Sequence, residues 1–118
     1  MKTAFISGHL DTTEDEFYQH YVGKIDKAVE NGDSFVVGDA RGTDTFAQEY
    51  LAGFTDKVVV YHMFKFPRNN KGHCRTVGNF GTDEERDAAM TSDSDYDIAW
   101  VRPGKEKSGT AKNINRRK

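Results

Sequence analysis

The loop at residues 38–44, Gly-Asp-Ala-Arg-Gly-Thr-Asp, combines two glycines with charged and small polar side chains. It lies between an apolar run and a helical pattern, so backbone N–H groups at the helix start would favour an anion such as a phosphate. Arg41 can form a bidentate pair with that phosphate, and Asp39 and Asp44 can accept hydrogen bonds from ribose hydroxyls. The alternative is a turn without a ligand, in which Gly38 takes an unusual dihedral and Asp44 caps the helix.

Two further loops have a similar composition. Ser7-Gly8-His9 follows the first apolar run, and Ser108-Gly109-Thr110 precedes a helical pattern and has lysines around it. The chain has neither the Gly-Lys-Ser/Thr of a Walker A loop nor the Gly-x-Gly-x-x-Gly of a dinucleotide-binding loop. Together the three loops predict a nucleotide or nucleoside-phosphate ligand, bound by Ser7, Gly8, His9, Gly38, Asp39, Ala40, Arg41, Gly42, Thr43, Asp44, Ser108, Gly109 and Thr110.

The elements that must position these loops are short strands and amphipathic helices in alternation. Apolar runs bounded by turn residues predict buried strands at 3–7, 34–37, 57–61 and 96–101. Helical spacing predicts one helix from a cap at Thr12 or Thr13 to about Glu30, a second around 46–51, and a third that Thr82 caps. Residues 62–82 show no period and predict a long irregular segment.

This order of elements predicts the fold class. Buried strands that alternate with helices form a parallel sheet covered on both faces. We therefore expect an α/β fold, a small Rossmann-like three-layer sandwich with a central parallel sheet of four to five strands, built by residues 1–118 as a single domain. Ligands of such sheets bind beyond the carboxyl ends of the strands, which is where all three loops lie.

Composition restricts the remaining function classes. The longest apolar run, residues 58–61, is far too short for a membrane span, and the first residues do not resemble a secretory signal. The single cysteine, Cys74, excludes an internal disulfide and predicts a cytoplasmic location. The four histidines lack metal-ligand spacing, so we expect no metal and no cofactor. A net charge of −2 argues weakly against a nucleic-acid partner.

Four segments in order give the chain a family resemblance. They are residues 7–9, residues 38–44, Arg86-Asp87-Ala88-Ala89-Met90, and Ser108-Gly109-Thr110-Ala111. In this arrangement the chain resembles the SLOG superfamily, the DprA and LOG group of Rossmann-like domains, which borders on the nucleoside deoxyribosyltransferases. The resemblance implies a nucleotide-type ligand and often a homo-oligomer. The chain lacks the Gly-Gly-Gly and Pro-Gly-Gly-x-Gly-Thr loops of the LOG hydrolases, and Trp100-Val101-Arg102 stands where deoxyribosyltransferases carry a nucleophilic glutamate.

Three activities stay open at this point. The first is nucleotide binding with hydrolysis of an N-glycosidic bond, for which a carboxylate must attack or activate water; the candidates are Asp39, Asp44 and Glu106. The second is a non-enzymatic sensor or sequestering protein for a signalling nucleotide. The third is a DprA-like subunit of a nucleic-acid-processing assembly.

The irregular segment mixes aromatic and basic side chains, among them Phe64, Lys65, Phe66 and Arg68. Such a segment can be a lid, a contact between subunits, or a surface that stacks bases and binds phosphates. The first 56 residues carry −7 and the remainder +5, a distribution that suits contact between copies. We expect a homodimer or higher oligomer with Phe64 and Phe66 near the contact. His73-Cys74 could form a thiolate–imidazole pair, although adjacent residues rarely face each other.

Overall fold

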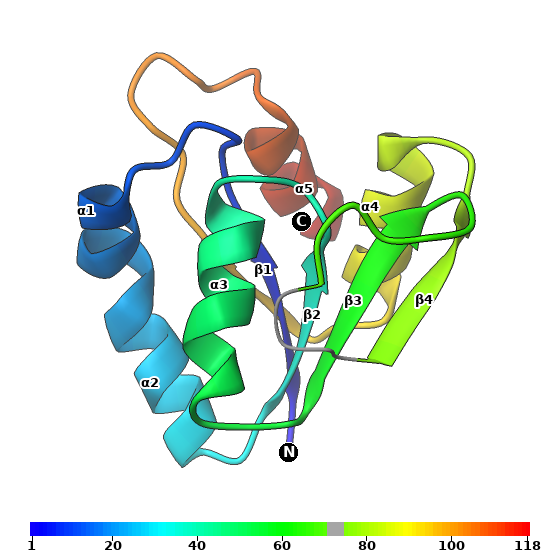
Figure 1. The fold of residues 1–118 in the computed structure, drawn as a ribbon. Coiled ribbons are helices and arrows are strands. Elements are labelled where there is room, and N and C mark those ends of the chain that lie inside the picture. The colour runs from blue at the N-terminus through cyan, green and yellow to red at the C-terminus, as the bar shows by residue number, and fades with distance from the viewer. Residues whose placement is uncertain (71–74) are drawn as a thin grey trace.

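Strands and helices alternate along most of the chain in the computed structural model, which describes residues 1–70 and 75–118 (Figure 1). The His73-Cys74 pair lies outside the described residues. None of the described helices is long and apolar enough to cross a membrane. The elements are β1 (Thr3–Ser7), α1 (Glu14–Phe17), η1 (Tyr18–Val22), α2 (Gly23–Glu30), β2 (Ser34–Gly38), α3 (Thr43–Ala52), β3 (Val58–Met63), β4 (Arg75–Phe80), α4 (Asp83–Ser92), β5 (Tyr96–Ala99) and α5 (Gly109–Arg117).

The described strands form one parallel sheet in the order β4-β3-β2-β1-β5. The strand order runs outward from β1 to β4 and then returns to the other side of β1 with β5. The switch point therefore lies between β1 and β5, and a ligand site is expected beyond their carboxyl ends. This topology confirms the predicted α/β Rossmann-like fold, and five strands fall within the predicted range.

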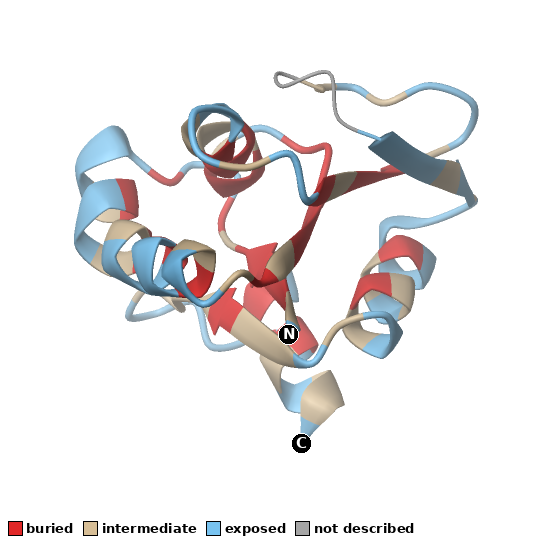
Figure 2. Ribbon diagram, turned by 90° about the horizontal axis from the view of Figure 1, so that it is seen from below, coloured by how far each residue is buried: buried red, intermediate tan, exposed pale blue. Residues whose placement is uncertain are grey.

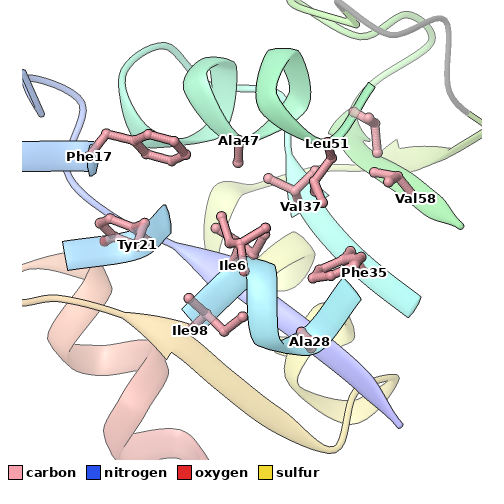
Figure 3. Close-up of a cluster of buried hydrophobic side chains, with 13 residues drawn as sticks. Ile6, Phe17, Tyr21, Ala28, Phe35, Val37, Ala47, Leu51, Val58 and Ile98 are labelled. Carbon is pink, nitrogen blue, oxygen red and sulfur yellow. The ribbon is translucent and has the colours of Figure 1, made fainter. Parts of the chain in front are cut away.

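Helices cover both faces of the sheet. The α1–η1–α2 segment and α3 lie over one face, and α4 and α5 lie over the other (Figure 1). The larger core cluster fills the first interface, where Ile6 and Val37 pack against Phe17, Tyr21 and Leu51 (Figure 3). Figure 2 shows the buried residues gathered along the central strands.

Side chains of β1 alternate between these two interfaces, as a strand requires. Ala4 and Ile6 belong to the larger cluster, whereas Phe5 packs with Val36, Tyr61 and Met90 in a smaller cluster beneath α4. Ser7 follows Phe5 at a spacing of two residues. Its side chain therefore lies on the α4 and α5 side, at the carboxyl end of the strand.

The prediction of an irregular segment over residues 62–82 was wrong at both ends, although residues 64–70 form no helix or strand. The strand β3 continues to Met63, and β4 occupies Arg75–Phe80 as an edge strand. The residues of β4 are exposed or half-buried. An edge strand with little apolar surface to bury has no need of a continuous hydrophobic run, so its sequence gives no strand signal.

The helix predicted from residue 12 or 13 to Glu30 is present, with one irregularity. Thr13 caps it, with Thr13 Oγ1 accepting from Glu16 N and Glu16 Oε1 accepting from Thr13 N. A π-helical stretch, η1, separates α1 from α2. Thr82 caps α4 as predicted, since its Oγ1 accepts from Glu85 N at 3.1 Å.

Candidate functional site

A cavity of about 450 Å³ lies at the carboxyl ends of β1, β2 and β5, on the α4 and α5 side of the sheet. The three predicted loops meet there, together with one face of α4 and the first turns of α5. Its lining consists of Phe5, Ser7, Gly8, His9, Leu10, Asp11, Ala40, Arg41, Asp44, Arg86, Asp87, Met90, Lys105, Ser108, Gly109, Thr110 and Asn113.

Most of the residues predicted to bind a ligand line this cavity. Those that do are Ser7, Gly8, His9, Ala40, Arg41, Asp44, Ser108, Gly109 and Thr110. Gly38, Asp39, Gly42, Thr43 and Glu106 do not line it. The glycines and Thr43 instead shape the loops, Asp39 is engaged in ion pairs, and Glu106 is exposed to solvent.

Ser7 supplies a buried hydroxyl without a partner. The residue is only 6% exposed, and its Oγ makes no hydrogen bond with any part of the chain that the structure describes. Buried polar groups in proteins are nearly always hydrogen-bonded, so an unpaired hydroxyl in a cavity wall calls for an explanation. Ser7 is also one of the residues that line the cavity, so a ligand bound there is a candidate for the missing partner.

The N-terminus of α5 faces the same cavity. Ser108 caps the helix, and its Oγ accepts from Ala111 N at 3.2 Å. Gly109 and Thr110 lie in the first turn, where backbone N–H groups have no partner within the helix. Nine residues of helix direct their dipole toward the cavity, which favours an anion there.

The positive side chains around the cavity differ in whether a carboxylate of the described residues pairs with them. Arg41 and Lys105 are exposed, and neither forms an ion pair within residues 1–70 and 75–118. The buried guanidinium of Arg86 is shared among Asp39, Asp83 and Asp87. Free positive charge therefore comes from Arg41 and Lys105, whereas Arg86 is neutralised within the wall.

Asp39 is fully buried and ties three segments together. Its Oδ2 accepts from Arg68 N at 2.7 Å, and its Oδ1 accepts from Arg68 Nη2 at 2.8 Å and Arg86 Nη1 at 2.9 Å. Burial opposes ionisation of this carboxyl, but the hydrogen bonds and charges of the two arginines outweigh it and lower the pKa of Asp39. Such a carboxylate is suited to hold the β2–α3 loop to its neighbours, and its catalytic role stays a prediction.

Asp44 lies in the wall of the cavity, and the pKa of its carboxyl shifts in the opposite direction to that of Asp39. Burial raises the pKa of its carboxyl to about 7, although the charge of Arg86 and the N–H of Ala40 act in the other direction. Ala40 N donates to Asp44 Oδ2 at 3.2 Å, and a Cβ at Gly38 would stand 2.6 Å from that oxygen. A carboxyl that holds a proton near neutral pH can both donate and accept one.

The alternative of a turn without a ligand predicted that Asp44 caps α3, and this prediction was wrong. The N-cap is Gly42, which has a φ of 78°, and Asp44 lies one residue inside the helix. A Cβ at Gly42 would stand 2.5 Å from His9 O, so glycine is required where this loop meets the first one.

The first loop is fixed by bonds to the other two. His9 O accepts from Thr43 N at 3.3 Å, and His9 Nε2 accepts from Arg102 N at 2.9 Å, which leaves the ring proton on Nδ1. Burial and the charge of Arg102 lower the pKa of His9. The Arg102 guanidinium binds Asp11 and Glu16, and its hydrogen bond to Glu16, with a backbone bond from Thr13, lowers the pKa of Glu16 to about 2.

Sequence reasoning missed the contribution of α4 and of the α5 residue beyond its first turn. Arg86, Asp87 and Asn113 line the cavity but were not predicted as site residues. Burial raises the pKa of Asp87. A signal was present, because Arg86 and Asp87 belong to one of the four segments that carry the family resemblance. Among the described residues no group of three metal-ligating side chains is close enough to hold a metal ion.

Comparison with known proteins bears on the fold. No protein-family model and no curated protein sequence matches this chain. The structure of DNA processing protein A from Helicobacter pylori, reported with a unique mode of single-stranded DNA binding, is similar with a TM-score of 0.63 at 21% sequence identity. The similarity covers 85% of this chain and 54% of that one. The chain therefore has a Rossmann-like fold similar to that of DNA processing protein A, over about half of that protein's length.

Proposed function

We propose that the cavity binds the phosphate group of a nucleotide or a nucleoside-phosphate derivative. The observation that carries this proposal is the unpaired, buried Oγ of Ser7 in the same cavity as the first turn of α5. Phosphate oxygens accept hydrogen bonds from hydroxyls and from backbone N–H groups alike. One phosphate would satisfy donors that have no partner among the described residues.

The size and charge of the cavity support a ligand larger than a phosphate ion. A volume of about 450 Å³ lies within the usual range for small-molecule sites. Arg41 and Lys105 provide the unpaired positive charge that a phosphate needs. Asp44, Asp87 and Asn113 offer hydrogen-bonding groups for sugar hydroxyls or a base.

A free nucleotide and a single-stranded nucleic acid both present such a phosphate, and the same side chains and N–H groups would recognise it in either. The overall charge of the chain argued weakly against nucleic acid. The fold similarity to a single-stranded-DNA-binding protein supports the nucleic-acid source more strongly than composition opposes it. Both sources belong in the test.

Turnover of the ligand would require a carboxyl at the glycosidic bond. Asp44 is the candidate that lines the cavity, and its pKa of about 7 suits proton transfer near neutral pH. Incubation with nucleoside monophosphates and detection of free base separates an enzyme from a sensor. Tight binding without release of base would favour the sensor.

The binding test is calorimetric titration with nucleoside monophosphates, the matching nucleosides, inorganic phosphate and a short oligothymidylate. We expect each monophosphate to bind more tightly than its nucleoside. A ligand at 100 times its Kd would raise the free energy of unfolding by about 2.7 kcal/mol, which a thermal melt detects. If neither monophosphates nor the oligonucleotide bind, or if nucleosides bind equally well, the proposal fails.

A further inference from the structure

Two phenylalanine side chains are exposed on the segment that follows β3. Phe64 is 65% exposed and Phe66 is 75% exposed, with Lys65 between them. We call these three residues the Phe64–Phe66 surface. It lies at the β4 edge of the sheet, on the segment that leaves β3 (Figure 1). None of the three residues lines the cavity described above.

The backbone holds Phe64 in an unusual conformation. Its φ is 55°, in the left-handed region that aromatic residues rarely adopt. Phe64 N donates to Phe80 O at 3.0 Å, and Phe64 O accepts from Asn79 N at 2.7 Å. Asn79 also has a positive φ, of 66°. Two such residues bonded to each other form a rigid support, and backbone strain of this kind tends to occur at functional positions.

The other side of Phe66 is also anchored. Arg68 donates to Asp39 through its backbone N and its guanidinium, and Asn69 Nδ2 donates to Asp39 O at 2.9 Å. The segment is therefore fixed on both sides of the exposed rings. This fixation argues against a lid that folds over the sheet, which was one of the alternatives for this segment.

The charge of the segment is entirely positive. Residues 64–80 contain Lys65, Arg68, Lys71 and Arg75 and no aspartate or glutamate. Arg68 is neutralised by Asp39 and Asp83. Lys65, between the two rings, forms no ion pair with any residue that the structure describes, whereas Arg75 lies beside Val59 at the other end of β4. An exposed aromatic pair beside unpaired positive charge is complementary to a polyanion that also presents flat apolar groups.

We propose that the Phe64–Phe66 surface binds single-stranded nucleic acid by stacking its rings on unpaired bases, while Lys65 contacts the phosphate backbone. A single strand offers both base faces and phosphates, whereas a duplex hides its base faces. This proposal goes beyond the phosphate cavity, because the two sites share no residue. It does not depend on whether the cavity takes a free nucleotide.

The main rival is a contact between two copies of the chain, as the sequence analysis expected. A two-fold contact through these rings would bring Lys65 close to Lys65 of the second copy. Like charges placed together at an interface disfavour the contact. The positive charge therefore favours an anionic partner over a second copy.

The test is fluorescence anisotropy of a labelled oligothymidylate of about 12 nucleotides at low salt. We expect Phe66→Ala to weaken binding about fivefold or more, the lower end of the effect of losing one stacked base. Phe64→Asn removes the other ring and keeps a residue that tolerates positive φ. Phe54→Ala is the matched control, because Phe54 is 59% exposed in the turn after α3. It should leave affinity unchanged.

Further measurements distinguish the partner. Lys65→Ala should reduce the magnitude of the slope of log K against log salt by the amount that corresponds to about one phosphate contact. A duplex of the same length should bind more weakly than the single strand. The proposal is overturned if the wild-type chain does not bind the oligonucleotide, if the ring variants bind as well as Phe54→Ala, or if duplex binds equally well. If light scattering showed that the wild type is a dimer and that Phe66→Ala is a monomer with unchanged affinity for the oligonucleotide, the surface would be assigned to self-association instead.

Discussion

Replacing Ser7 by alanine should move stability and ligand affinity in opposite directions. The Ser7 Oγ is buried and makes no hydrogen bond with the described residues. An unpaired buried hydroxyl costs about 1–3 kcal/mol, so its removal should raise the free energy of unfolding of the free protein by about 1 kcal/mol. If the hydroxyl donates to a phosphate, its loss should weaken binding of a nucleoside monophosphate by about 1.5–3 kcal/mol. Urea unfolding and calorimetric titration measure the two quantities.

A matched control for this variant exists in the same chain. Thr91 Oγ1 is the other buried hydroxyl without a partner in the described part of the protein, and Thr91 does not line the cavity. Thr91→Val should therefore resemble Ser7→Ala in stability and leave affinity for the monophosphate unchanged. The comparison separates relief of an unpaired polar group from loss of a ligand contact.

Two results would refute the reasoning about Ser7. If Ser7→Ala lowered the free energy of unfolding by 1 kcal/mol or more, the hydroxyl would have a hydrogen-bond partner within the protein and would not need one from a ligand. If the variant bound monophosphates as tightly as the wild type, the phosphate would lie elsewhere in the cavity. The hypothesis of phosphate binding at the first turn of α5 would then lose its main support.

Four further predictions test individual parts of the site. Arg41→Ala should weaken binding of a monophosphate about 10- to 100-fold with unchanged urea stability; a large loss of stability would show that Arg41 is structural. Asp39→Asn should destabilise the fold by about 1.5–3 kcal/mol, because Arg86 loses one of its three carboxylate partners and Arg68 loses its buried one; a loss below 1 kcal/mol would free Asp39 for catalysis. Gly8→Ala should destabilise by about 1–3 kcal/mol, since its Cβ would meet Thr43 Oγ1 and Tyr21 Oη, whereas Gly23→Ala meets nothing and should not destabilise. Because the Asp44 pKa is raised, its contribution to stability is complete below about pH 4 and is lost as pH rises through about 7. The pKa of His9 is lowered, so this residue changes stability with pH in the opposite direction. Urea unfolding of the wild type and of Asp44→Asn at pH 5 and pH 8 therefore isolates Asp44, because His9 contributes equally to both proteins. If the free energy of unfolding changed by the same amount between the two pH values in both proteins, the raised pKa of Asp44 would be contradicted.

Features of this fold that depend on neighbouring residues were predictable from sequence. The caps at Thr13, Thr82 and Ser108 each accept a hydrogen bond from an N–H three residues later. The central strands are buried on both faces, so their apolar runs show them directly. The carboxyl ends of parallel strands meet at one edge, which is why nine of the predicted binding residues line one cavity.

Features that depend on distant partners were not predictable. The strand β4 pairs on one side only and is mostly exposed, so neither an apolar run nor an alternation marks it. Arg86 and Asp87 reach the cavity because α4 packs beside the ends of β2 and β3, a relation that no spacing along the chain reveals. The family resemblance included both residues but assigned them no role.

Asp39 and Asp44 illustrate the limit most clearly. Within residues 38–44 the two carboxyls have similar neighbours, and the sequence gives them equal weight as candidates. In the structure Asp39 meets Arg68 and Arg86, which are 29 and 47 residues away along the chain, and its pKa falls. Asp44 receives one backbone N–H and lies in the cavity wall, so burial dominates and its pKa rises to about 7. Both arginines bind Asp39 directly, whereas the charge of Arg86 lowers the pKa of Asp44 by less than burial raises it, so the two carboxyls of one loop shift in opposite directions.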